Sequence, residues 1–174
     1  NRITKLEGGM ASIACSSGMA SIMNAILGLV RSGEEIISSA SLYGGTIDLF
    51  RDLEEYGITT RYVKNNDWEA IEAAFNERTR AVFAETIGNP CLDVTDVERL
   101  AEIAHAHQVP LILDNTTATV YLFQGLAHGA DIVVNSSSKY INGNSNSISG
   151  VLTYSGSFRF DLEKYGGLSS YKQY

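Results

Sequence analysis

The sequence predicts an α/β fold, a mostly parallel sheet with helices on both faces. Short apolar runs alternate with amphipathic stretches of helical length, and a glycine or a polar cluster stands at nearly every junction. The runs 111–113 and 132–134 are unbroken apolar segments, which is typical of parallel strands that helices cover on both sides. The connections between the runs are long enough for a helix, so right-handed crossovers are the expected topology.

The alternation predicts helices and strands in turn along the chain. The helices, whose apolar residues recur every three or four positions, are expected at 17–30, 46–56, 67–75 and 96–108. The strands, which are short and rich in apolar or β-branched residues, are expected at 35–38, 58–63, 80–85, 111–114 and 132–134. We expect no strand before the first helix and no closing helix after 151–154.

Capping residues support the predicted ends of the helices. Ser17 precedes the first helix, and Asp67 and Asp96 precede two later ones, where their side chains can accept a hydrogen bond from a free backbone N–H. Gly57 follows the helix at 46–56 as its expected C-terminal cap. Pro110 prevents the helix at 96–108 from continuing.

The pattern ends after 151–154, in a stretch rich in glycine, serine and tyrosine. We therefore assign 1–154 to the central part of one large domain. We assign 155–174 to the start of a connection to a C-terminal domain outside this sequence. The segment 1–9 is equally abrupt, because it leads almost directly into the first helix.

Composition excludes several classes of protein. The 174 residues include 13 basic and 20 acidic side chains, a formal charge of −7, which disfavours nucleic acid and anionic membranes as partners. No apolar run approaches the roughly 18 residues of a membrane span. Cys15 and Cys91 match no disulfide framework, and no leader opens the chain, so we expect a cytoplasmic protein.

The rules of parallel sheets indicate where a ligand would bind. Ligands bind beyond the carboxyl ends of the strands, where loops and helix N-termini converge. The segments expected at that edge are 16–19, 85–90, 114–116 and 136–139. Segment 16–19 places small residues at a helix N-terminus, which favours an anion such as phosphate. Ser136 and Ser138 can add hydroxyl donors; the alternatives are that Ser17 is only an N-cap and that the two serines form a polar loop.

Lys139 and Asp114 are the most informative pair. They are 25 residues apart, one helix plus one strand, so they are expected at the same sheet edge on different strands. We expect the Lys139 amine to be partly desolvated, which suits a Schiff base, and a carboxylate at the end of a buried strand needs a cationic partner such as a protonated pyridine nitrogen. The alternatives are a surface lysine and an aspartate that caps the following turn.

Other candidates are weaker. Tyr43 lies on a glycine-rich turn, where its ring could cover a flat cofactor or simply pack. His105 and His107 face different sides of a helix, so we expect no metal site. A dinucleotide-binding domain would need a Gly-x-Gly-x-x-Gly turn, which the sequence lacks.

Five motifs in order resemble the pyridoxal-phosphate enzymes of cysteine and methionine metabolism, the cystathionine γ-synthase-like family. They are Ser-Ser-Gly-Met (16–19), Leu-Tyr-Gly-Gly-Thr (42–46), Glu-Thr-Ile-Gly-Asn-Pro (85–90), Asp-Asn-Thr (114–116) and His-Gly-Ala-Asp-Ile-Val-Val-Asn-Ser-Ser-Ser-Lys-Tyr-Ile (128–141). The likeness runs from about Leu6 to Val151. The tail at 155–168 looks most like the O-acetylhomoserine sulfhydrylase branch.

The resemblance implies the large domain of a fold type I pyridoxal-phosphate transferase. It implies that Lys139 attaches the cofactor and moves protons, and that Asp114 holds the pyridine nitrogen protonated. It assigns Tyr43 to ring stacking and to departure of the γ-substituent, Thr116 to the other ring face, and Asn89 to the 3′-oxygen or the substrate carboxylate. The residues that it assigns to the 5′-phosphate are Gly18, Met19, Ser136 and Ser138, and Ser17 is a further expected cofactor-binding residue.

The implied reaction is γ-replacement on O-acetylhomoserine by sulfide or a thiol, in homocysteine and methionine synthesis. The alternatives are a γ-lyase, or a cystathionine synthase or lyase, of the same family. A further alternative is a truncated, non-catalytic remnant that associates with itself. The expected partners are an amino-acid substrate and further copies of the chain, as a dimer or tetramer.

Overall fold

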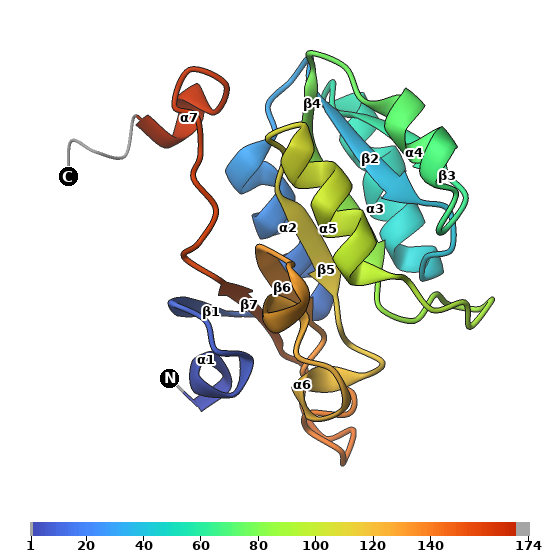
Figure 1. The fold of residues 1–174 in the computed structure, drawn as a ribbon. Helices are drawn as coiled ribbons and strands as arrows, with labels where there is room; N and C mark the ends of the chain where they lie inside the picture. Colours follow the sequence, from blue (N-terminus) through green and yellow to red (C-terminus); the bar gives the residue numbers. More distant parts are fainter. Residues whose placement is uncertain (1, 170–174) are drawn as a thin grey trace.

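A computed structural model describes residues 2–169, and in these residues one seven-stranded sheet runs through the molecule in the order β1-β7-β6-β5-β4-β2-β3 (Figure 1). The strands are β1 (Ala11–Cys15), β2 (Glu35–Ser39), β3 (Thr59–Val63), β4 (Thr79–Glu85), β5 (Leu111–Asp114), β6 (Ile132–Asn135) and β7 (Gly150–Tyr154). The predicted strands are all present, to within a residue at either end. Residues 170–174 of the proposed connection lie outside the described residues.

The sheet is mostly parallel. Strands β3, β2, β4, β5 and β6 pair in parallel, whereas β7 is antiparallel to both of its neighbours, β6 and β1. Our expectation that no strand precedes the first helix is wrong, because β1 does. Strand β1 lies at the sheet edge and is largely exposed. Its sequence, Ala-Ser-Ile-Ala-Cys, therefore lacks the apolar pattern by which a buried strand is predicted.

The predicted helices are present, with ends close to the expected ones. They are α2 (Gly18–Leu29), α3 (Gly44–Glu55), α4 (Trp68–Ala74) and α5 (Val97–Ala106). The side chains of Ser17, Asp67 and Asp96 each accept a hydrogen bond from a backbone N–H in the first turn, at 3.0–3.1 Å. Gly57 has a φ of +82°, which explains the glycine after α3.

Four short helices have no counterpart in the prediction, because four to six residues are too few to show a period. They are α1 (Arg2–Glu7), α6 (Thr119–Leu122), the 3₁₀ helix η1 (Gly125–His128) and α7 (Gly166–Ser169). The last of these corrects our expectation of no closing helix.

Two apolar cores cover the two faces of the sheet, as predicted. Helices α2 and α3 cover one face of the sheet, and α4 and α5 cover the other (Figure 1). Ile36 belongs to the core beneath α2 and α3, and the next residue, Ile37, to the core beneath α4 and α5. In the first core the rings of Phe50 and Phe83 meet edge to face, with centroids 5.1 Å apart. Side chains at the sheet centre, such as Phe83 and Ile112, are fully buried.

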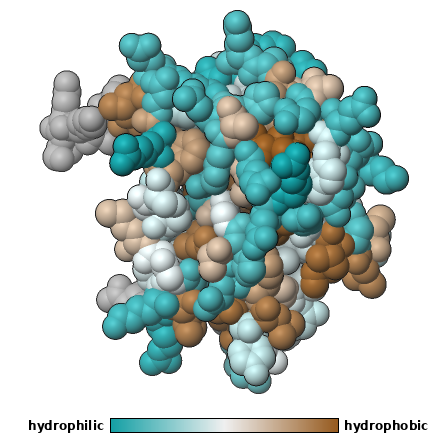
Figure 2. Space-filling model, viewed as in Figure 1, coloured by the Kyte–Doolittle hydropathy of each residue, from teal (hydrophilic) through white to brown (hydrophobic). Residues whose placement is uncertain are grey.

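The outer surface is mixed. Figure 2 shows a mainly hydrophilic face on which hydrophobic residues form separate patches. Large exposed hydrophobic side chains include Met10, Ile13, Leu92, Tyr121, Leu122 and Ile148. Among residues 2–169, none of the helices has the length and apolar character needed to cross a membrane.

Candidate active site

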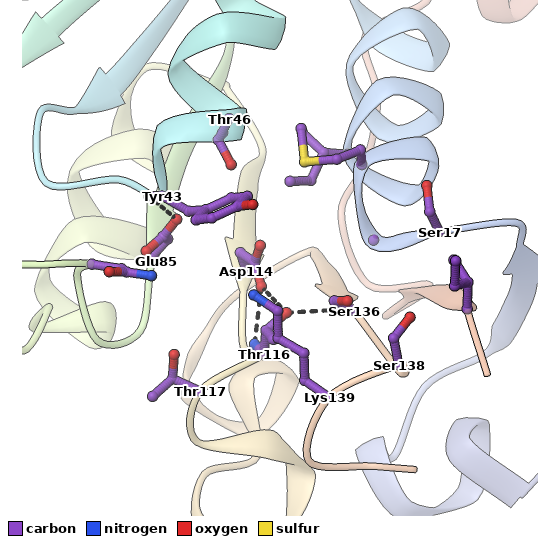
Figure 3. A pocket seen from close by; sticks show the side chains of 15 residues that line it. Ser17, Tyr43, Thr46, Glu85, Asp114, Thr116, Thr117, Ser136, Ser138 and Lys139 are labelled. Carbon is purple, nitrogen blue, oxygen red and sulfur yellow. Dashed lines mark hydrogen bonds between the residues drawn. The ribbon is translucent and has the colours of Figure 1, made fainter. Parts of the chain in front are cut away.

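One cavity of about 190 Å³ opens at the carboxyl ends of β4, β5 and β6, beside the first turns of α2 and α3. All of the cofactor-site residues predicted from sequence line it: Ser17, Gly18, Met19, Tyr43, Asn89, Asp114, Thr116, Ser136, Ser138 and Lys139. Side chains that the sequence analysis did not select also line it: Ile22, Thr46, Glu85, Thr117 and Ile148. Figure 3 shows Ser17, Ser136 and Ser138 on one side of the cavity and Tyr43 and Glu85 on the other.

A close approach of two turns shapes the serine side. An added Cβ at Gly18 would lie 2.5 Å from the Cβ of Ser136, so only glycine allows the turn before α2 to reach the turn after β6. The N–H groups of Gly18 and Met19, the first two of α2, have no carbonyl one turn earlier in the helix. These donors and the positive end of the helix dipole favour an anion here.

The three serines of this side differ in what they offer. Ser17 caps α2, as the alternative interpretation held, and it also lines the cavity. The Ser138 hydroxyl donates to the Ser149 carbonyl at 3.0 Å and accepts from the Ser149 N–H at 2.8 Å. Ser138 is therefore tied to the backbone, and Ser136 and Ser17 are the hydroxyl donors more readily available to an anion.

Asp114 ends β5 at the floor of the cavity. Its Oδ1 accepts hydrogen bonds from the Thr116 N–H at 2.9 Å and the Thr116 hydroxyl at 2.5 Å, and that hydroxyl accepts from the Ser136 N–H at 2.8 Å. Asp114 thus caps the following turn through one oxygen, which leaves Oδ2 for a ligand. Burial raises the pKa of Asp114. A cation in the cavity would offset that cost.

Lys139 and Tyr43 face each other across the cavity. The Lys139 Nζ lies 4.6 Å from the centroid of the Tyr43 ring, a cation–π distance. Lys139 is exposed as a whole residue, but it also lines the cavity, so partial desolvation of its amine stays a prediction. Tyr43 is 44% exposed, so its ring is not a core aromatic.

Glu85 is the acidic residue that sequence reasoning missed. It ends β4, is 6% exposed, and accepts a hydrogen bond from the Tyr43 N–H at 2.7 Å. Burial raises its pKa to about 7; Asp114 also raises it, whereas the N–H groups of Tyr43 and Asn89 and the charge of Lys139 lower it. The signal was available, since Glu85 ends a buried strand just as Asp114 does.

The three histidines do not line this cavity, and each pairs with a carboxylate. His105 pairs with Asp131 at 2.8 Å, while the other two pair with separate carboxylates. Within residues 2–169, no three potential metal ligands come together.

Comparison with known proteins decides the family. Residues 1–166 match the family model described as Cys/Met metabolism PLP-dependent enzyme. The chain belongs to this family. The family's cofactor is pyridoxal 5′-phosphate, so the predicted family and cofactor are confirmed.

Curated proteins with similar sequences support the same family assignment. An O-acetyl-L-homoserine sulfhydrylase of Corynebacterium glutamicum is 46% identical over 168 residues, 95% of this chain and 38% of the relative. A cystathionine beta-lyase of Lactococcus lactis is 42% identical over 152 residues, 87% of this chain and 40% of the relative. The chain thus spans well under half the length of these curated relatives.

A solved structure confirms the fold class. The putative O-acetylhomoserine (thiol)-lyase of Campylobacter jejuni, which carries N′-pyridoxyl-lysine-5′-monophosphate, superimposes with a TM-score of 0.88 at 35% identity. The superposition covers 90% of this chain and 39% of the other.

The residues present fit the family's cofactor. A glycine-only cradle with free N–H groups lies at one end of the cavity, a half-buried carboxylate with a spare oxygen lies on its floor, and a primary amine lies opposite an aromatic ring. These features match a phosphate, a ring nitrogen that can be protonated, an aldehyde and a flat ring, respectively.

Proposed function

We propose that the protein takes part in γ-replacement on O-acetylhomoserine by sulfide or a thiol. The γ carbon–oxygen bond breaks and acetate leaves with the electron pair, while the sulfur bonds to the same carbon and loses a proton. The names of the relatives support this substrate class. The observation that carries the proposal is the meeting of Lys139, Asp114 and the Gly18 cradle in one cavity.

Each residue has a role that follows from its place. Pyridoxal 5′-phosphate, when bound, supplies an electron-withdrawing ring that acidifies the substrate α-hydrogen. The Gly18 and Met19 N–H groups, with the Ser17 and Ser136 hydroxyls, bind its phosphate, and Ser138 orients this turn through Ser149. These assignments rest on donors at a helix N-terminus and on the contacts described above.

Residues on the other side of the cavity would bind the pyridine ring of the cofactor and transfer protons on the substrate. Asp114 would hold the ring nitrogen, and Thr116 keeps that carboxylate in place. Lys139 is the amine that would attach the cofactor, and its free amine would carry a proton at the substrate α-carbon. Tyr43 would cover the ring and assist acetate departure, and Asn89 would bind the ring oxygen or the substrate carboxylate.

The proposal also covers the domain organisation, the oligomeric state and the location of the protein. We take 1–154 as the central part of the pyridoxal-phosphate-binding large domain and 155–174 as the start of a connection to a C-terminal domain. We also propose a homo-oligomer, a dimer or tetramer, in the cytoplasm. Sedimentation of the purified protein measures the oligomeric state.

A lyase is the second candidate function. The likeness to a cystathionine beta-lyase favours it, because the same cavity residues serve elimination when no sulfur nucleophile follows. Incubation of the protein and cofactor with O-acetylhomoserine separates the two: homocysteine formed only with sulfide indicates replacement, and 2-oxobutanoate formed without it indicates elimination. A β-lyase breaks a bond to the β carbon, which carries no leaving group in O-acetylhomoserine, so cystathionine is tested as well, and pyruvate formed from it indicates β-elimination. None of these products, despite cofactor binding, would support the non-catalytic alternative.

Cofactor attachment tests the site directly. We expect pyridoxal 5′-phosphate to give a visible absorbance band with the wild-type protein and with Lys64→Ala, whose side chain lies outside the cavity. The Lys139→Ala variant should lack the band, because it has no amine at that place. After borohydride reduction, peptide mapping should find the adduct on Lys139, and an adduct on another lysine would refute the assignment.

A further inference from the structure

Glu85 lies in the candidate site without a role in the proposed function. It ends β4 and is 6% exposed, and its partner in the parallel register is Asp114 of β5. We propose that Glu85 is a positioning residue, which fixes the place of the Tyr43 ring by holding the Tyr43 backbone N–H. This inference rests on the proposed function for the meaning of Tyr43, but its geometry can be tested separately.

The hydrogen bond sits where a helix lacks its usual cap. Tyr43 is the N-cap residue of α3, and its side chain makes no capping hydrogen bond. Its own N–H points away from the helix and donates to Oε1 of Glu85 at 2.7 Å, the contact drawn between these residues in Figure 3. A carboxylate at this place also interacts favourably with the N-terminal end of the dipole of α3.

The same carboxyl group also lies beside the loop after β4. The Asn89 N–H of that loop lowers the pKa of Glu85, so the side chain lies between the turn before α3 and this loop. The two loops meet again further out, where the Ser41 hydroxyl donates to Asp93. Glu85 is thus the inner of two links, and it is the one that lines the cavity.

Placement of the Tyr43 backbone determines where its ring lies. The ring folds back on its own helix, since a Cβ at Gly45 would lie 2.7 Å from Cε1 of Tyr43. One edge of the ring therefore packs against the backbone of Gly45. A shift of the turn before α3 would therefore move the ring relative to Lys139, whose Nζ lies 4.6 Å from the ring centroid.

The hydrogen bond between the Tyr43 N–H and Glu85 should depend on pH, because Glu85 can be protonated. Asp114 and Lys139 are the charged groups facing it, and its pKa of about 7 reflects burial first. A carboxylate accepts a hydrogen bond from an N–H more strongly than a neutral carboxyl group does. The Tyr43 N–H bond should therefore strengthen as pH rises through about 7.

Amide hydrogen exchange at Tyr43, measured by NMR without cofactor, tests the proposal. Glu85→Leu removes the acceptor and should speed exchange at Tyr43 about tenfold, whereas Glu85→Gln keeps an acceptor oxygen and should stay within about threefold of wild type. The matched control is Glu7→Gln, a buried carboxyl group outside this cavity whose pKa is also raised to about 7. Unchanged exchange in Glu85→Leu would overturn the proposal.

A second measurement covers the case in which Glu85→Leu fails to fold. In the wild-type protein the Tyr43 amide proton shift should titrate with a midpoint of about 7, and it should not titrate in Glu85→Gln. A Tyr43 shift that titrates equally in wild type and in Glu85→Gln would overturn the proposal, whereas a midpoint at any pH that is present in wild type and absent in Glu85→Gln supports it. Absorbance with pyridoxal 5′-phosphate keeps the two hypotheses apart, because a wild type that shows the Tyr43 titration but no band fails only the proposed function.

Discussion

Glu85 and Asp114 lie opposite each other in the register of two parallel strands, and each is the last residue of its strand. Two carboxyl groups therefore open onto one cavity, and Lys139 is the cation that faces both. Burial raises the pKa of each, and Asp114 raises that of Glu85 further. The charge that a ligand meets in the cavity thus changes near neutral pH.

Replacement of Asp114 tests its part in cofactor binding. Asp114→Asn keeps the size of the side chain but removes the charge that a protonated ring nitrogen would meet. A charge-assisted hydrogen bond contributes about 1.5–3 kcal/mol, so pyridoxal 5′-phosphate should bind roughly ten- to a hundredfold more weakly. Titration of the absorbance band measures the affinity. Asp96→Asn, which keeps the cap of α5, should bind like wild type, and equal affinity in both variants would contradict the assignment.

Two glycines of α2 give opposite predictions for the same substitution. Gly18→Ala places a Cβ against Ser136 and should lower the free energy of unfolding by about 1–3 kcal/mol and weaken cofactor binding. Gly28→Ala meets nothing within 4 Å inside the helix and should raise stability by about 0.5–1 kcal/mol. Urea unfolding measures both. The cradle would be ruled out if Gly18→Ala were as stable as Gly28→Ala.

Most elements that the sequence predicted have apolar residues that face a core; the edge strand β3, which is mostly exposed, was predicted from its β-branched and aromatic residues instead. Ile36 and Ile37 alternate between two cores, and their strand was predicted; β1 (Ala11–Cys15) borders solvent, and it was not. The site followed from topology, since the ends of parallel strands converge. The exposure and the hydrogen bonds of individual site residues could not be predicted from the sequence, because they depend on neighbours distant in sequence. Lys139 is exposed, and the Ser138 hydroxyl is bonded to Ser149.

Glu7 predicts a stability that depends on pH. It is 2% exposed, and burial raises its pKa from 4.5 to about 7. The folded state therefore keeps a proton that the unfolded state releases above pH 4.5, so the contribution of Glu7 is fully present at lower pH and is lost as pH rises toward 7. The loss is on the order of 3 kcal/mol.

Glu7→Gln should remove that loss. Because glutamine does not ionise, the fall in the free energy of unfolding between pH 4.5 and 7 should be smaller in the variant than in wild type, by on the order of 3 kcal/mol. Urea unfolding at several pH values measures it. Glu102→Gln, at an exposed position on α5, is the control and should follow wild type. Parallel curves for Glu7→Gln and wild type would show that Glu7 does not titrate in this range.

The Thr116 hydroxyl connects the two ends of the cavity, because it donates to Asp114 and accepts from the Ser136 N–H. Thr116→Val keeps the shape of the side chain but removes both bonds, and it leaves the Ser136 N–H without its acceptor. We expect a loss of about 1–3 kcal/mol in the free energy of unfolding, together with weaker cofactor binding, because the floor and the phosphate end no longer share a link. Thr117→Val changes the adjacent, exposed threonine and should cost less than about 0.5 kcal/mol. If the two variants unfold at the same urea concentration, the hydroxyl link contributes nothing to the fold, and the strand end and the Thr116 N–H suffice to position Asp114.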